Sequence, residues 1–238
     1  MSQENATTSI TPNQAALKMF ASFLVTLLLS AMLIFGCAGR LNWSLGWIFV
    51  TAWIIPKLLF LILLRWLDPD LLIERVTRHK NTQRYDKIIL PIYFVFAFGT
   101  FIVASLDGGR FRWSGDVPLA LVIASYIVYL LGNSLAGWAI NSNPFFSAES
   151  RLQTDRAQKV TSTGPYRFVR HPAYIAAFLL WITTGLMLES WWAVIPGFMA
   201  GLMMVIRTVY EDRMLQAELP GYAEYAAQVR YRLVPGIW

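Results

Sequence analysis

The sequence is poor in metal-binding and redox-active side chains: among 238 residues it has one cysteine, Cys37, and two histidines, His79 and His171. A single cysteine excludes an internal disulfide and a thiolate metal cluster, and we expect Cys37 to pack as a small side chain within an apolar run. The two histidines lie far apart without a pattern of further ligands, so we predict no metal site. His79, between Arg78 and Lys80, is expected to be a solvated loop residue.

The sequence also lacks the motifs of several large enzyme classes. It has no glycine-rich phosphate loop and no nucleophile elbow, which argues against a P-loop nucleotide site and against a serine hydrolase. It has no internal repeat and no low-complexity tract, so a solenoid architecture is not expected.

Charge is scarce as well, because charged residues make up 14% of the chain and hydrophobic residues 56%. A soluble domain of this size cannot bury that much apolar surface, so the solvent for much of the chain must be lipid. Four apolar runs are each close to the roughly 20 residues that cross a bilayer, and they lie at 17–38, 46–64, 88–106 and 117–140.

Two shorter apolar runs follow, at 173–188 and 191–206, joined by Glu189 and Ser190. They predict a helical hairpin that packs against the other helices and spans the bilayer or nearly does so. The expected fold is therefore an all-α polytopic membrane protein of about six transmembrane helices, with a four-helix body and a C-terminal hairpin. After the hairpin, a helix is expected to continue to about Glu218 and to break at Pro220.

Lysine and arginine are distributed unevenly between the connections. The 65–87 loop has 6 of them, the 141–172 loop has 5 and the 207–238 tail has 4, whereas the opposite face has only Arg40, Arg110 and Arg112. The positive-inside rule then places both termini and both long loops in the cytoplasm, and we expect a multi-pass protein of a prokaryotic plasma membrane. Anionic lipid headgroups account for this basic face, so no nucleic-acid partner is predicted.

The chain divides by character into three parts. Residues 1–16 are polar and expected to be mobile, residues 17–140 form the four-helix body, and residues 141–238 hold most of the polar groups that suggest chemistry. Lys57, next to Pro56 within the second helix, either lines a polar cavity or reaches the interface, and the sequence leaves both interpretations open.

The densest polar cluster is the segment 164–174, which places two arginines, His171 and two tyrosines between apolar runs. Further on, Arg207 and Glu211 are four residues apart and share one helix face. They either form a local ion pair or contact an anion and a cation beside the 164–174 loop. Charged groups at the mouth of a membrane helix are costly, which favours the second interpretation.

Together these residues resemble a known family. The pattern Gly164-x-Tyr166-x-x-x-Arg170-His171-Pro172-x-Tyr174, then Arg207-x-x-x-Glu211 and Gly221-Tyr222-x-x-Tyr225, is similar to that of the isoprenylcysteine carboxyl methyltransferase family. That family groups with phospholipid N-methyltransferases among integral membrane enzymes that use S-adenosylmethionine. The resemblance covers about residues 141–238, and the first four helices match only in being membrane helices.

The resemblance implies a set of site residues. Those expected around S-adenosylmethionine, in a cytoplasmic cofactor-binding loop and tail, are Gln158, Lys159, Val160, Thr161, Tyr166, His171, Pro172, Ala173, Tyr174 and Glu211. Arg207 is expected to be the catalytic residue that binds the substrate near the methyl acceptor. Two positions depart from the family pattern, since Gln158 stands where a histidine is frequent and Asp212 where a glutamate is usual.

The implied function is methylation of a lipophilic substrate that enters from the membrane, most like carboxyl O-methylation of an isoprenylcysteine-type acid. A phospholipid amine or another lipophilic acid fits the same entrance, and the oligomeric state is open. Two other hypotheses remain: an NADPH-dependent membrane reductase similar to the sterol and steroid reductases, and a non-catalytic protein whose basic loops bind anionic lipid.

Overall fold

The structure is a computed structural model that describes residues 10–77 and 81–238, so His79 lies outside the described residues. Every regular element in these ranges is a helix. The long helices are α1 (Pro12–Ala38), α2 (Ser44–Leu67), α4 (Asp86–Ala104), α5 (Leu119–Ser142), α6 (Pro172–Met187) and α7 (Val194–Glu218). The shorter ones are α3 (Pro69–Val76), a π-helical turn η1 (Ser105–Phe111), the 3₁₀ turns η2 (Thr154–Arg156) and η3 (Gly164–Arg167), and α8 (Tyr222–Gln228).

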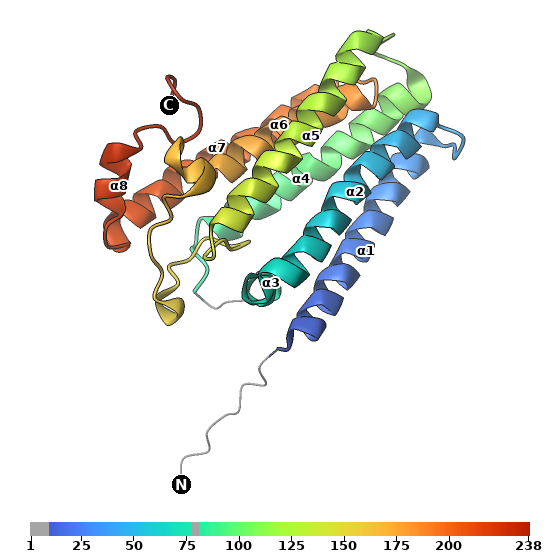
Figure 1. The fold of residues 1–238 in the computed structure, drawn as a ribbon. Helices are drawn as coiled ribbons and strands as arrows, with labels where there is room; N and C mark the ends of the chain where they lie inside the picture. The colour runs from blue at the N-terminus through green and yellow to red at the C-terminus, as the bar shows by residue number, and fades with distance from the viewer. Residues whose placement is uncertain (1–9, 78–80) are drawn as a thin grey trace.

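The long helices run side by side, and two ends of the bundle differ in character (Figure 1). At one end lie α3, α8 and the segment between α5 and α6, and we call this the loop end. At the far end the helices are joined by short connections (Figure 1). Among helix pairs, α6 packs closely against both α5 and α7, and α7 also packs against α4.

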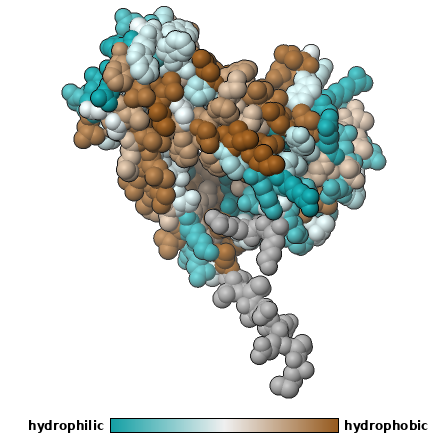
Figure 2. Space-filling view, turned by 180° about the vertical axis from the view of Figure 1, so that it is seen from behind, coloured by the Kyte–Doolittle hydropathy of each residue, from teal (hydrophilic) through white to brown (hydrophobic). Residues whose placement is uncertain are grey.

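Five helices are long and apolar enough to cross a membrane, and α6 is a shorter apolar helix. The predicted all-α polytopic fold is confirmed, with α6 as the short arm of the hairpin. Apolar side chains cover much of the helical surface, and a hollow opens between them on the face seen from behind (Figure 2). Large exposed side chains such as Leu28, Met32 and Val95 are what a lipid-facing surface requires.

Two helix boundaries differ from the sequence prediction. Helix α1 begins at Pro12 rather than near residue 17, because Thr11 and Gln14 form a capping box that satisfies the first backbone N–H groups. Residues 12–16, expected to be mobile, are therefore helical. The second arm of the hairpin and the helix after it are one continuous helix, α7, which ends at Glu218 as predicted.

Helix α3 was missed by the sequence analysis, which assigned 65–87 to a loop. Asp68 caps it by accepting a hydrogen bond from the N–H of Leu71 at 2.9 Å, and Pro69 occupies its first turn. Leu71 and Leu72 are fully buried against Ala15 and Leu64. The helix lies across the loop end and carries Glu74 and Arg75 on its last turn.

At the far end, Asp107 of η1 fixes the hairpin connection. Its carboxylate accepts hydrogen bonds from the backbone N–H of Ser114 at 2.8 Å and from the hydroxyl of Ser190 at 2.6 Å, and also from the Ser114 hydroxyl. Gly108 packs against the carbonyl oxygen of Leu188, so any side chain there would collide with backbone. This fully satisfied carboxylate is a structural tie between the two halves of the chain.

Candidate functional site

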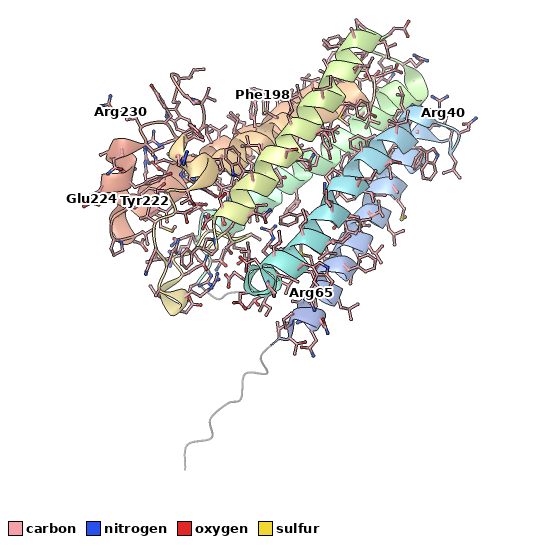
Figure 3. All side chains as sticks on the ribbon, viewed as in Figure 1. Arg40, Arg65, Phe198, Tyr222, Glu224 and Arg230 are labelled. Atoms are coloured by element: carbon pink, nitrogen blue, oxygen red, sulfur yellow. The ribbon has the colours of Figure 1, made fainter. Side chains whose placement is uncertain are left out.

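A pocket at the loop end brings together side chains from the segment between α5 and α6, from α7 and from α8. We call it the polar pocket. Nine of the ten residues predicted around the cofactor line it: Gln158, Lys159, Val160, Thr161, Tyr166, His171, Ala173, Tyr174 and Glu211. The tenth, Pro172, is buried at the first turn of α6, where its fixed backbone starts the helix directly after His171. Among the labelled side chains of Figure 3, Tyr222 lies at this end and Arg40 at the opposite end.

Aromatic and aliphatic side chains complete the walls. Tyr222 and Tyr225 line the pocket from α8, Met214, Leu215 and Leu219 line it from α7 and the turn that follows, and Phe145 and Phe146 line it from the segment after α5. The free volume inside is about 90 Å³. Ligand pockets typically have roughly 300–1,000 Å³, so a nucleoside-sized ligand requires the surrounding loops to separate.

Glu211 presents the carboxylate of this pocket. Its Oε2 accepts hydrogen bonds from the hydroxyl of Tyr174 and from the hydroxyl of Ser150, both at 2.5 Å. Within the part of the chain that the structure describes, no cationic side chain lies within ion-pair distance of Glu211. A half-buried carboxylate that has only hydroxyl donors keeps a negative charge available for a cationic ligand.

The neighbouring Asp212 is in the opposite situation, because cations surround it. Arg170 binds it with two bonds, Nε to Oδ1 at 2.8 Å and Nη2 to Oδ2 at 3.0 Å, and Arg232 Nε donates to Oδ2 at 2.8 Å. The Tyr222 hydroxyl donates to Oδ1 at 3.0 Å, and His171 Nε2 lies 3.3 Å from the same oxygen. Asp212 is fully buried and organises the site rather than facing a ligand.

Arg170 also attaches the C-terminal tail to the pocket. Its Nη1 donates to the carbonyl oxygens of Val229 at 2.8 Å and Arg230 at 3.1 Å. The backbone continues this attachment, since the N–H groups of Arg170 and His171 donate to the carbonyls of Tyr231 and Arg232. The Arg-His-Pro segment therefore builds the pocket by folding the tail over it, and both Arg170 and His171 line the ligand space.

Arg207, the predicted substrate-binding residue, is held by an acid that the sequence analysis did not identify. Its Nε and Nη2 each donate to Asp86 at 2.8 Å, and Nη2 also donates to the carbonyl of Ala148 at 3.1 Å. Its guanidinium lies over the Tyr174 ring, 5.3 Å from the centroid. The ion pair is thus with Asp86 on α4 rather than with Glu211 on its own helix.

Two buried tyrosines of the site have protonated hydroxyls. Burial raises the pKa of the Tyr166 and Tyr225 hydroxyls above the ordinary value, so both stay protonated at neutral pH. The Tyr225 hydroxyl donates to the backbone carbonyl of Tyr166 at 2.7 Å, which fixes α8 against η3. At Gly164, which has a φ of +58°, an added Cβ would collide with Ser142, so this turn needs glycine.

A second, larger space adjoins the polar pocket, and we call it the apolar cavity. It has a volume of about 1200 Å³ and is lined by residues of α1, α2, α3 and α5, among them Phe23, Trp53, Lys57 and Trp138. Ser147 and Glu149 line both spaces, with Ala148 between them on the cavity side. We call Ser147–Ala148–Glu149 the shared wall; Arg207 and Asp86 hold it through the Ala148 carbonyl and the N–H of Ser150.

No group of three or more metal-ligating side chains is found in residues 10–77 and 81–238. Cys37 is half-buried and unpaired within α1, as a packing side chain would be. Lys57 lines the apolar cavity, and its Nζ lies 4.3 Å from the centroid of the Trp53 ring.

The chain is similar to known proteins in sequence and in fold. The sequence profile of the phospholipid methyltransferase family matches residues 119–219, a range that includes every predicted site residue. The cobalt-zinc-cadmium resistance protein CzcN of Cupriavidus metallidurans is 34% identical over 132 residues, which are 53% of this chain and 56% of that protein. The chain thus spans about half the length of this curated relative.

The fold matches a solved structure along nearly its whole length. The eukaryotic intramembrane Ras methyltransferase ICMT (isoprenylcysteine carboxyl methyltransferase) superposes with a TM-score of 0.51 at 16% identity, covering 95% of this chain and 96% of that one. The predicted resemblance to membrane methyltransferases of the ICMT and phospholipid methyltransferase type is confirmed. At this identity the structural match establishes the fold, so activity has to be argued from the site.

Proposed function

We propose that this chain is an integral membrane methyltransferase that uses S-adenosylmethionine to methylate a lipophilic acid presented from the membrane. The observation that carries the proposal is Glu211, a carboxylate with no cation within ion-pair distance among the described residues, which lies in an aromatic pocket of a fold shared with a membrane methyltransferase. The residues present suit the cofactor's charges and rings.

The carboxylate of Glu211, with the faces of Tyr166 and Tyr174 in the same pocket, suits a sulfonium cation. Lys159 and His171 lie in the same lining and supply positive or hydrogen-bonding groups for a carboxylate of the cofactor. The aliphatic side chains of Val160 and Leu219 provide an apolar contact for a purine ring.

The chemistry then depends on placing and desolvating two reactants. S-adenosylmethionine would supply an activated methyl group, so a carboxylate acceptor forms the new O–C bond as the S–C bond breaks, and no proton has to move. The chain therefore needs no general base for this acceptor. Arg207 and Asp86 fix the shared wall, and the Arg207 guanidinium lies beside Tyr174 at the place where the two reactants would meet.

A second candidate function is N-methylation of a phospholipid amine, which the family match over 119–219 favours. An amine acceptor has to lose a proton, and His171 and Glu211 are the groups in the pocket able to accept it. NADPH-dependent reduction remains the alternative from another enzyme class. The entrance for cofactor is proposed on the cytoplasmic side, in accord with the basic loops.

The test is a calorimetric titration of the detergent-solubilised chain with S-adenosylhomocysteine and with NADPH in parallel. We expect saturable binding of S-adenosylhomocysteine and none of NADPH. Tyr166→Ala removes a pocket wall and should weaken that binding at least about tenfold, which corresponds to about 1.4 kcal/mol. Tyr231→Ala, at a tyrosine outside the pocket lining, is the matched control and should leave it unchanged.

Absence of S-adenosylhomocysteine binding at millimolar concentration would refute the methyltransferase proposal. Binding of NADPH in its place would move the chain to the reductase hypothesis.

A further inference from the structure

The apolar cavity contains a guanidinium that lacks an acidic partner. Arg75, on the last turn of α3, lines the cavity, and its Nε and Nη1 atoms are shielded from solvent without a hydrogen-bond partner among the described residues. The guanidinium carbon lies 5.6 Å from the centroid of the Phe60 ring and 5.4 Å from that of Phe146. Two aromatic rings therefore position the guanidinium while leaving Nε and Nη1 without a hydrogen bond.

Three other buried arginines of the described chain each bind a carboxylate, although the Nε of Arg151 also has no hydrogen-bond partner. Arg170 binds Asp212, Arg207 binds Asp86, and Arg151 binds Glu74 at 2.8 Å and Asp155 at 2.7 Å. Glu74 is next to Arg75 in the sequence, but its carboxylate binds Arg151.

Two carboxylates, those of Glu74 and Glu149, line the same cavity as Arg75, but both have other partners. Glu74 binds Arg151, and Glu149 accepts a hydrogen bond from the hydroxyl of Thr82. Burial lowers the pKa of the Arg75 guanidinium to about 10, which leaves it charged at neutral pH. A buried charge without a partner is costly, and an anionic ligand would offset that cost.

Arg75 lies at the junction of the two spaces. Phe146, on which its guanidinium packs, lines the polar pocket, and Ser147 and Glu149 of the shared wall line both spaces. An acid bound at Arg75 therefore lies beside the shared wall, and this wall has to move before the acid can meet a methyl group in the polar pocket. On the other side, the cavity runs past Phe23, Trp53 and Leu180, which form a surface suited to hydrocarbon.

Two lysines also line the cavity: Lys18, which is exposed on α1, and Lys57, which differs from Arg75 in its surroundings. The Nζ of Lys57 lies over the Trp53 ring and 3.5 Å from the Trp53 carbonyl oxygen, so it already has partners. It is located ten residues before the end of α2, about 15 Å along the helix at 1.5 Å per residue. Lys57 is therefore placed beside the chain of a bound amphiphile rather than beside its headgroup.

We propose that Arg75 is the positioning residue that holds the acid group of an amphiphilic substrate, with the hydrocarbon chain of that substrate lying in the apolar cavity. This inference rests on the proposed function and assigns the acid group of its substrate to a named residue. A guanidinium suits a carboxylate because a hydrogen bond between two charged groups is stronger than one between neutral groups. Methylation of the carboxylate gives a neutral ester, which loses the attraction to Arg75, so product leaves more readily than substrate.

The test measures binding of three probes by calorimetry, with and without S-adenosylhomocysteine: N-acetyl-S-farnesylcysteine, its methyl ester and dioctanoylphosphatidylethanolamine. Wild type should bind the acid more tightly than the ester. Arg75→Met should weaken binding of the acid about 10- to 100-fold, the loss expected for a charge-assisted pair. It should leave binding of the ester and of S-adenosylhomocysteine unchanged, and Arg75→Lys should restore part of the affinity for the acid.

Lys57→Met is the matched control, since it removes a cation from the same cavity and should cost less than Arg75→Met. Equal losses in the two variants, or an acid affinity that Arg75→Met does not change, would overturn the inference. If Arg75→Met does not fold, equal binding of acid and ester by the wild type overturns it as well.

An Arg75-dependent affinity for the phosphatidylethanolamine alone would overturn the inference as well, because Arg75 would then hold a lipid phosphate rather than the acid that accepts the methyl group. Failure of the proposed function can be distinguished from failure of this inference. If the proposed function fails, S-adenosylhomocysteine binds neither to wild type nor to any variant, whereas the affinities for acid and ester can still be compared.

Discussion

The polar pocket and the apolar cavity lie on the two sides of the shared wall. The charged group that we propose as a ligand contact is negative in the polar pocket and positive in the apolar cavity. Among the described residues, the carboxylate of Glu211 in the polar pocket has no cation within ion-pair distance, whereas two donors of Arg75, which lines the apolar cavity, have no hydrogen-bond partner. Both are surrounded by charged groups that are paired, such as Asp212 with Arg170 and Asp86 with Arg207.

The number of bonded partners distinguishes charged groups that stabilise the fold from charged groups that we expect to contact a ligand. Paired groups such as Asp212 have several donors each and join segments distant in sequence, so their role is to hold the loops and tail in place. Glu211 and Arg75 make fewer hydrogen bonds and ion pairs to segments distant in sequence. We therefore interpret the first set as architecture and the second as ligand contacts, a cation on one side of the shared wall and an anion on the other.

The largest effect is expected at Asp212, because its loss leaves Arg170 buried without a counter-charge. Asp212→Asn should lower the free energy of unfolding by about 3–5 kcal/mol, the cost of breaking a buried ion pair. The measurement is chemical unfolding in detergent micelles, followed by tryptophan fluorescence. Asp155→Asn, at an acid whose side chain is 58% exposed, is the control and should change stability by about 1 kcal/mol or less. A loss equally small at Asp212 would remove the distinction between architecture and ligand contact.

A smaller, more selective effect is expected at Glu211. Glu211→Gln should weaken binding of S-adenosylmethionine, which carries a sulfonium, by about 1.5–3 kcal/mol, the range for hydrogen bonds and contacts that involve a charge. Binding of the uncharged S-adenosylhomocysteine should change much less, since the cation is absent. Calorimetric titration of both ligands gives the comparison, and Glu218→Gln, at an exposed acid of the same helix, is the control. Equal losses for the two ligands would show that Glu211 does not sense the charge.

The smallest effect is expected from narrowing the apolar cavity. Gly137 lines it, and an added Cβ meets no atom within 4 Å, so Gly137→Phe places a ring in the cavity without displacing backbone. Binding of a lipophilic acid should weaken about tenfold, or about 1.4 kcal/mol, with S-adenosylhomocysteine binding unchanged. Gly36→Phe is the matched control, because Gly36 is equally open but lies on an exposed face of α1. If both variants bind the acid like wild type, the cavity is not its site.

The sequence allowed much of the fold to be predicted, since apolar runs long enough to span a bilayer have few alternatives in lipid. Helix α3 was missed because it has only eight residues and lies within a charged stretch, where capping by Asp68 and burial of Leu71 and Leu72 decide the structure. The early start of α1 depended likewise on the local cap at Thr11.

In the site, nine of the predicted cofactor residues line one pocket because they come from two compact motifs whose spacing is visible in the sequence. The partners of these residues were not predictable in the same way. Asp86 and Arg207 are 121 positions apart, and nothing local marks Asp86 at the start of α4 as the acid that holds Arg207. Arg75 could not be identified from the sequence for a related reason. Only the packed structure shows that two atoms of its guanidinium lack a hydrogen-bond partner.

The most direct test of the central claim is one set of titrations in which wild type, Glu211→Gln and Arg75→Met are each measured against S-adenosylmethionine and against N-acetyl-S-farnesylcysteine. We predict that Glu211→Gln loses affinity for the cofactor alone and that Arg75→Met loses affinity for the acid alone. Loss of both ligands in both variants, or of neither ligand in either, would contradict two oppositely charged sites on the two sides of one wall.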